Sequence, residues 1–219
     1  MPDYAEARLL MVETQLRTCE VVDRDLIAAM LDVPRERFVP EARAGLAYSD
    51  MGHQLAGASR RIMPTPVGFA RLAQLAEIGR NDVVLDIACG TGYSTAVLAR
   101  LASAVVALED DDDLVAEADA ALTALEVGNA AVLRGQLDEG VPSEAPFDVI
   151  FIGGAVDSVP PALLAQLKEG GRLVAGIIHG PTSVASLFIK SEGIVTHHEA
   201  FDIGLPRLSA FAEPVGFAF

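Results

Sequence analysis

Apolar residues in the first third of the chain recur at the spacing of an amphipathic α-helix. This spacing covers residues 4–18 and 67–76, and Asp23 stands where it can cap a further helix. That helix must end ahead of Pro34, because the residue before a proline disfavours helical backbone. The stretch 34–63 is broken by prolines and glycines. The pattern therefore predicts helices at both ends of this region with irregular chain between them.

Beyond residue 80 the pattern changes to short apolar runs that alternate with helical segments. Runs typical of buried strands lie at 83–87, 104–108, 131–133, 147–152 and 172–178, and helical segments at 93–101, 114–125 and 160–167. Alternation of this kind predicts a doubly wound, mostly parallel α/β sheet. Two last runs, 183–190 and 194–201, are joined by three residues, too few for a crossover helix, so they are expected to pair antiparallel.

The predicted sheet therefore has seven strands, mostly parallel, with antiparallel strands at the C-terminal end. We expect residues 1–66 to form a helical and irregular segment on the substrate side. Residues 67–219 are expected to form the ligand-binding core as one compact unit.

Composition and charge limit the kinds of molecule that this protein is expected to bind. The 219 residues are 51% hydrophobic and 21% charged, which is typical of a globular protein, and the formal net charge is −15. A negative field repels phosphate backbones, so nucleic acid is not an expected partner. The two cysteines and four histidines show no metal-ligand spacing, and no stretch is long and apolar enough to span a bilayer. A cytoplasmic protein without a metal site is expected, and its oligomeric state is left open.

The candidate chemistry begins at the glycine-rich turn after the first buried strand. In a doubly wound sheet, ligands bind outside the carboxyl ends of the strands, which is where Asp86, Gly90 and Gly92 lie. A single Gly-x-Gly is equally typical of a tight turn with no ligand. This turn alone therefore leaves both interpretations open.

Glu109 distinguishes between them. It ends the second strand, nineteen residues after Gly90, where a carboxylate can accept hydrogen bonds from both hydroxyls of a ribose. Thr95 stands where a dinucleotide-binding turn has its third glycine, so a nucleoside without phosphates fits better. The alternative is that Glu109 opens a solvated acidic run, residues 109–113.

Several segments then resemble a known family. The turn 86–92, Asp-Ile-Ala-Cys-Gly-Thr-Gly, with an acidic residue after the second strand resembles the signature of class I S-adenosylmethionine-dependent methyltransferases. The strings at 11–17, 33–40 and 47–50 look like the N-terminal region of protein-L-isoaspartate O-methyltransferases, and those at 147–150 and 163–174 are similar to later parts of that family. The resemblance spans nearly the whole chain.

This resemblance implies a Rossmann-like fold and methyl transfer from S-adenosylmethionine to the carboxylate of an isoaspartyl residue in a damaged protein. Carried over to this sequence, the cofactor-binding residues are Asp86, Ala88, Gly90, Thr91, Gly92, Glu109, Gln136 and Leu137. Gln136 replaces an acidic residue of the family, although its carbonyl oxygen can still accept a hydrogen bond from an adenine amino group.

The methyl-accepting side departs further from the family, which has Thr-Ile-Ser-x-Pro before the first strand of the core. Here Pro64 stands in place of the hydroxyl, Thr65 is one position away, and Asp50 matches an Asp of the family near the substrate cleft. We predict catalytic roles for Thr65 and Asp50. Arg60 and Arg61 could clamp a substrate carboxylate, and the alternative is that both are solvated.

The substitution at Pro64 keeps two rival functions open. One is a methyltransferase with the same cofactor and a different acceptor, such as an acidic small molecule in place of a peptide or protein carboxylate. The other, which Gln136 also favours, is a catalytically silent S-adenosylmethionine-binding or interaction protein.

Overall fold

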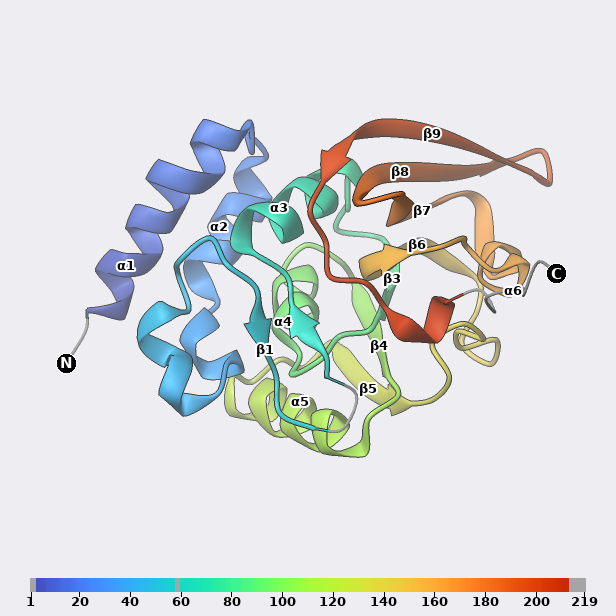
Figure 1. Ribbon diagram of the computed structural model, residues 1–219. Helices are drawn as coiled ribbons and strands as arrows, with labels where there is room; N and C mark the ends of the chain where they lie inside the picture. The colour runs from blue at the N-terminus through green and yellow to red at the C-terminus, as the bar shows by residue number, and fades with distance from the viewer. Residues whose placement is uncertain (1–2, 58–59, 213–219) are drawn as a thin grey trace, which may run out of the picture.

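The computed structural model describes residues 3–57 and 60–212, so residues 213–219 of the predicted core lie outside it. The chain forms one seven-stranded sheet with helices packed on it (Figure 1). The α-helices are α1 Tyr4–Met11, α2 Arg24–Asp32, α3 Pro66–Leu75, α4 Tyr93–Leu98, α5 Asp112–Ala124 and α6 Pro161–Ala165. The strands of the main sheet are β3 Val83–Ile87, β4 Ala104–Glu109, β5 Ala130–Arg134, β6 Phe147–Val156, β7 Leu167–His179, β8 Thr182–Ser191 and β9 Ile194–Ile203.

The order of strands across the sheet is β5-β4-β3-β6-β7-β8-β9. The first five are parallel, and β8 pairs antiparallel with both β7 and β9. This confirms the predicted sheet. Because the chain moves outward from β3 to β4 on one side and to β6 on the other, β3 marks the point where the strand order reverses, and ligands bind at such a point.

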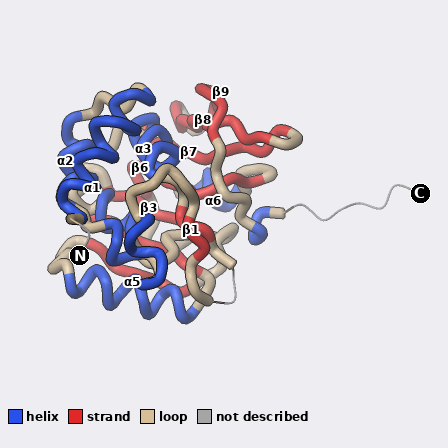
Figure 2. Tube along the Cα trace, turned by 60° about the vertical axis from the view of Figure 1, so that its left-hand side comes forward, coloured by secondary structure: helices blue, strands red, loops and turns tan. Residues whose placement is uncertain are grey.

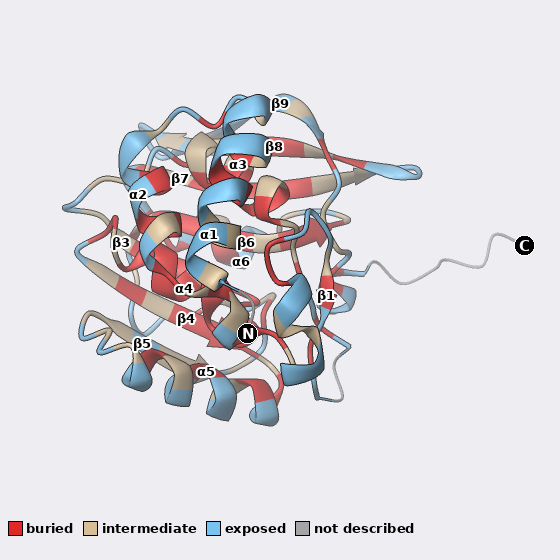
Figure 3. Cartoon of the chain, turned by 90° about the vertical axis from the view of Figure 1, so that its left-hand side faces the viewer, coloured by how far each residue is buried: buried red, intermediate tan, exposed pale blue. Residues whose placement is uncertain are grey.

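Alternate side chains of the strands enter two separate cores. Val84 and Val149 face the helices α1 to α5, while Leu85 and Ile150 face the opposite side, which α6 and the chain around residues 137–145 and 208–211 cover. Both faces of the inner parallel strands β3 and β6 are therefore buried, as their continuous apolar sequence requires, whereas the edge strand β5 is only partly covered. The outward faces of α1 and α5 are exposed (Figure 3).

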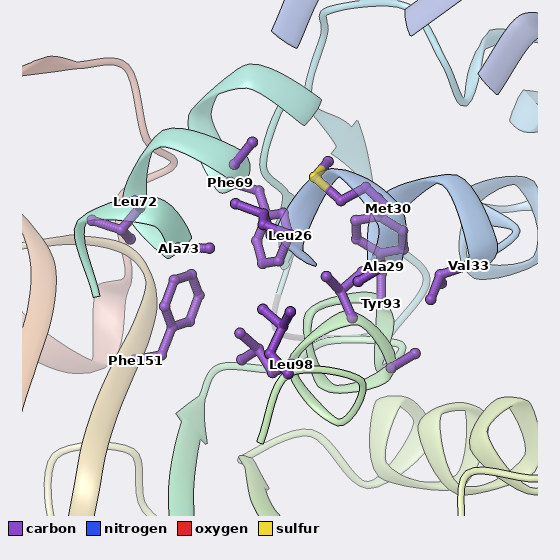
Figure 4. Packing of buried hydrophobic residues seen from close by; sticks show 14 of the residues in the cluster. Leu26, Ala29, Met30, Val33, Phe69, Leu72, Ala73, Tyr93, Leu98 and Phe151 are labelled. Carbon is purple, nitrogen blue, oxygen red and sulfur yellow. The ribbon is translucent and has the colours of Figure 1, made fainter. Parts of the chain in front are cut away.

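The N-terminal helices pack on the same core as α3 and α4. Figure 2 shows α1 and α2 on the side of the molecule where α3 lies. In Figure 4, Leu26 and Met30 of α2 approach Phe69 of α3 and Tyr93 of α4, with Phe151 of β6 beneath them. The rings of Phe69 and Tyr93 are 5.6 Å apart and meet edge to face, an arrangement that aromatic pairs prefer. The segment that precedes the sheet is thus held against β6 and against α4, the helix that follows the glycine turn.

The structure differs from the predicted elements in three places. The helix expected over 4–18 is α-helical only in α1 and continues as a π-turn, Val12–Leu16, and a 3₁₀ turn, Arg17–Cys19, where threonine hydroxyls bond to backbone carbonyls of the preceding turn. Within the region expected to be irregular there are two 3₁₀ turns, Arg35–Phe38 and Glu41–Leu46, and a small hairpin of β1 His53–Gln54 and β2 Ile62–Met63. The helix expected over 160–167 ends at Ala165, and β7 begins at Leu167, which pairs with Phe147 ahead of a register shift.

Candidate functional site

The glycine turn after β3 is built for a close approach of backbone to ligand. Ala88, Gly90 and Gly92 all have positive φ, of 64°, 58° and 91°, and the N–H of Ala88 donates to the carbonyl of Leu108 in β4 at 2.9 Å. A Cβ on Gly90 would lie 2.7 Å from the Leu55 side chain, so a larger residue would force that side chain to move and would also be strained by the positive φ. The turn is thereby fixed to the adjoining strand, and α4 begins directly after it.

Glu109 lies at the carboxyl end of β4, beside this turn, as predicted. Its carboxylate is fully buried and accepts the N–H of Gly90 at 2.8 Å. It is also held by Arg61, whose Nη2 and Nε donate to the two carboxylate oxygens at 2.8 and 3.2 Å. Arg61 Nη2 reaches Asp110 as well, at 2.7 Å. Burial raises the pKa of Glu109, and the contacts with Arg61 and Gly90 oppose that shift.

Arg61 is therefore the buried ion-pair partner of Glu109, the residue predicted to bind the ribose. Its side chain is 6% exposed and its Cγ lies 3.6 Å from where a Cβ on Gly90 would be. The interpretation of Arg61 as solvated is wrong, while its neighbour Arg60 is exposed. Arg61 directly precedes β2 in the β1–β2 hairpin, and its guanidinium reaches Glu109 at the end of β4.

Asp86 is the second buried acid of the site. The hydroxyls of Ser94 and Thr95 both donate to its Oδ2 at 2.7 Å, and its Oδ1 is buried without a hydrogen-bond partner among the described residues. Burial raises the pKa of Asp86 to about 7, against the lowering effect of the two hydroxyls. An orphaned carboxylate oxygen next to a glycine turn is an acceptor for a ligand donor such as an ammonium group.

The other predicted cofactor residues lie at the same end of the sheet but face different surroundings. The Thr91 hydroxyl is buried and donates to the carbonyl of Phe38 at 2.6 Å, so it fastens the turn to the N-terminal segment. Gln136 is exposed and donates to Glu139 at 3.3 Å, whereas Leu137 is buried in the core on the α6 side. Both follow β5, next to the end of β4.

A pocket lies between the glycine turn and the chain before α3. Its lining includes Ala88, Cys89 and Gly90 from the turn and Arg61 and Pro64 from the opposite wall. The space inside it that a water molecule can enter is about 20 Å³, which is room for about one water. Burial raises the pKa of the Cys89 thiol, so this cysteine is protonated at neutral pH and packs as a small apolar residue.

The two predicted catalytic residues meet at the N-terminus of α3. Thr65 is the N-cap, and its hydroxyl accepts the N–H of Gly68 at 3.0 Å. Asp50 is exposed, and its carboxylate accepts the N–H of Val67 at 3.3 Å. The pocket wall beside them is formed by Pro64. Their catalytic roles stay predictions.

One residue of the pocket was missed from the sequence. Arg35 is fully buried, and its guanidinium carbon lies 4.6 Å from the centre of the Tyr93 ring. It stands in a string that resembles the family, but nothing in its spacing indicates that an arginine there turns inward. For Tyr93, the first residue of α4, the sequence pattern indicates only that it lies in a helix.

Comparison with known proteins bears on the whole chain. The family model described as Protein-L-isoaspartate(D-aspartate) O-methyltransferase matches residues 7–202. A protein-L-isoaspartate O-methyltransferase of Methylorubrum extorquens (strain PA1) is 43% identical over 219 residues, which is 100% of this chain and 93% of that protein. The chain belongs to the protein-L-isoaspartate O-methyltransferase family.

Solved structures agree with the fold of this family. A protein-L-isoaspartate O-methyltransferase that is 25% identical superimposes with a TM-score of 0.77 over 92% of this chain and 64% of that one. A protein described as a putative family member from Plasmodium falciparum, in complex with S-adenosyl-L-homocysteine, gives 0.78 at 21% identity over 96% of this chain and all of that one. The fold is thus shared with these structures over more than nine-tenths of this chain.

The expectations about a membrane span and about a metal site can be compared with the described residues. Across residues 3–57 and 60–212, no helix is long and apolar enough to cross a membrane. The same ranges hold no cluster of three or more His, Cys, Asp or Glu side chains suited to a metal ion.

Proposed function

We propose that this protein is an S-adenosylmethionine-dependent methyltransferase that esterifies the free carboxylate of isoaspartyl residues in damaged proteins. The observation that carries the proposal is family membership over residues 7–202, with a relative of the same name matched along the full chain. The glycine turn and the buried Glu109 supply a site of the right chemistry at the point where the strand order reverses.

The residues of the turn fit this cofactor. We assign Glu109 to the ribose hydroxyls, and the orphaned Oδ1 of Asp86 to the ammonium of the methionine moiety. Gln136 and Leu137 follow β5 on the side where the adenine is expected. When bound, the cofactor supplies an electrophilic methyl group that a carboxylate oxygen can take in a single displacement.

An ionised carboxylate needs no general base, so the protein's contribution is to bind the acceptor, align it and keep water out. The pocket wall at Pro64 and the N-terminus of α3, with Thr65 and Asp50, lie where that alignment is expected. Pro64 brings neither a hydroxyl nor an N–H, so any donor to the acceptor must come from another residue.

Arg61 has to release Glu109 before a ribose can reach that carboxylate. Its guanidinium donates hydrogen bonds to both carboxylate oxygens of Glu109. The pocket beside them has room for about one water molecule. Once released, Arg61 is free to pair with Asp110 alone or with an acidic acceptor. Cofactor binding therefore requires the Arg61 side chain to move away from Glu109.

Pro64 favours one alternative, a methyltransferase with the same cofactor and an acidic small-molecule acceptor. A single assay separates the two. Purified protein is incubated with methyl-labelled cofactor and either an isoaspartyl peptide or the same peptide with normal aspartate. Base-labile label on the isoaspartyl peptide alone supports the proposal. Cofactor binding by calorimetry without label on that peptide overturns it in favour of the alternative acceptor, and no cofactor binding leaves an interaction protein.

The role of Glu109 has its own test. Glu109→Gln should weaken binding of S-adenosylhomocysteine by about 1–3 kcal/mol, because a charged acceptor to two hydroxyls is lost. The exposed Glu117→Gln is the matched control, with the same chemical change on the outer side of α5. Calorimetry that gives the same dissociation constant for both variants would remove Glu109 from the cofactor site.

A reducing, cytoplasmic location stays a prediction. Its support is that Cys19 and Cys89 are both free thiols.

A further inference from the structure

Arg35 is a buried cation that faces the pocket without a carboxylate partner. Its side chain is fully buried, and none of the acidic groups in residues 3–57 and 60–212 lies within ion-pair distance of it. Its Nε donates to the carbonyl of Ala47 at 2.9 Å and its Nη2 to the carbonyl of Pro64 at 2.5 Å. Nη1 is buried and has no hydrogen-bond partner among the described residues.

Tyr93 presents a second unmet donor beside it. The guanidinium of Arg35 stacks on the Tyr93 ring, and the Tyr93 hydroxyl is also buried without a hydrogen-bond partner. Both residues line the same pocket as the glycine turn and Pro64. Two orphaned donors at one pocket wall, one of them charged, form a site for an oxyanion.

The energetics favour an anion over water at this place. A buried charge is costly unless it is paired, and the loss of solvation on burial lowers the pKa of Arg35. The opposing contributions come from Tyr93, Tyr48 and the exposed Asp50, none of which forms an ion pair with it. Arg35 is therefore a buried cation with no ion-pair partner among the described residues.

We propose that Arg35 and Tyr93 form a carboxylate-binding subsite. The inference rests on the proposed function, which brings two carboxylates into this pocket: that of the methionine moiety of the cofactor and that of the acceptor. Because Arg35 bonds to the carbonyl of Pro64, the subsite lies beside the position where the family has its hydroxyl. A guanidinium and a phenol then provide the donors that Pro64 cannot.

Tyr93→Phe is the sharpest variant. It keeps the ring that stacks on Arg35 and contacts Phe38 and Phe69, and it removes a hydroxyl that bonds to nothing in the described chain. The melting temperature should stay equal or rise, whereas a structural hydroxyl would lower it. Arg35→Lys keeps the positive charge but loses the planar, two-pronged donor geometry of the guanidinium. Tyr4→Phe is the control, because it removes a tyrosine hydroxyl outside the pocket.

Calorimetry with two ligands identifies the source of the carboxylate. S-adenosylhomocysteine carries the methionine carboxylate, and 5′-methylthioadenosine lacks the whole amino-acid part. If the cofactor supplies the carboxylate, Tyr93→Phe weakens binding of the first by about tenfold and leaves the second unchanged. If the acceptor supplies it, both affinities stay and the KM for an isoaspartyl peptide rises by a similar factor.

The proposed subsite is overturned if both Tyr93→Phe and Arg35→Lys keep the wild-type affinity for the two ligands and the wild-type KM for the isoaspartyl peptide. The proposed function would stand in that case. If the wild-type protein binds no S-adenosylhomocysteine, the proposed function fails, and formate then decides the subsite alone. Formate should raise the melting temperature of the wild type above its value in chloride of equal ionic strength. The same change of anion should raise the melting temperature of Tyr93→Phe by a smaller amount. An equal response of the two proteins would overturn it.

Discussion

Asp86 links cofactor binding to pH. Burial raises its pKa from about 3.8 to about 7, so the folded state binds a proton that the unfolded state has released between those values. Its contribution to stability is present below about pH 4 and is lost as the pH rises through about 7. The free energy of unfolding of Asp86→Asn should therefore fall less over pH 4–7 than that of the wild type, as measured by urea titration.

The same group should make cofactor affinity rise with pH. Only ionised Asp86 attracts the ammonium of the methionine moiety, so binding of S-adenosylhomocysteine should tighten between pH 6 and 8 in the wild type. Asp86→Asn should bind weakly without that rise. A variant that retains the full pH dependence would show that another group is responsible.

Arg61 competes with the ribose for Glu109. Arg61→Met removes the guanidinium and keeps much of the apolar stem, so binding of S-adenosylhomocysteine should tighten, by up to about tenfold, while the unpaired buried Glu109 lowers the melting temperature. Arg60→Gln, at the exposed neighbour, should change neither. Weaker binding in Arg61→Met would mean instead that Arg61 holds the ligand.

Both predicted catalytic residues bond to the start of α3, so the stability of this helix and the chemistry must be tested separately. Thr65 caps the helix through the N–H of Gly68. Thr65→Ala should lower the free energy of unfolding by about 1 kcal/mol, and Thr65→Ser should restore it. If Thr65 is only a cap, the turnover of the folded Thr65→Ala protein matches the wild type under stabilising conditions. A loss of turnover that Thr65→Ser repairs supports its catalytic role.

The order of elements explains why the site sits where it does. β3 is central, and its turn contacts β4 through the carbonyl of Leu108 and through Glu109. The periodicity predicted these strands because each is a continuous apolar run buried on both faces. It did not predict the β1–β2 hairpin, since two-residue strands leave no periodic signal.

The net charge of −15 acts on the whole molecule and on its choice of substrate. At low ionic strength, isoaspartyl peptides with flanking lysines should show a lower KM than peptides with flanking glutamates. The difference should shrink toward 0.5 M salt, because the Debye length falls to a few ångströms. Steady-state kinetics on one peptide pair at two salt concentrations measures this. A difference that persists at high salt would indicate direct contacts in place of the long-range field.

The sequence by itself determined the strands, the glycine turn, the position of Glu109 at the end of β4 and the capping role of Asp23. These depend on local periodicity and on backbone preferences of neighbouring residues. The tertiary structure alone decided that Arg61 pairs with Glu109, 48 residues away, and that Arg35 is buried against Tyr93. Such pairings arise from how the N-terminal segment packs across the sheet, and an arginine in a sequence carries no mark of whether it will face water or a pocket.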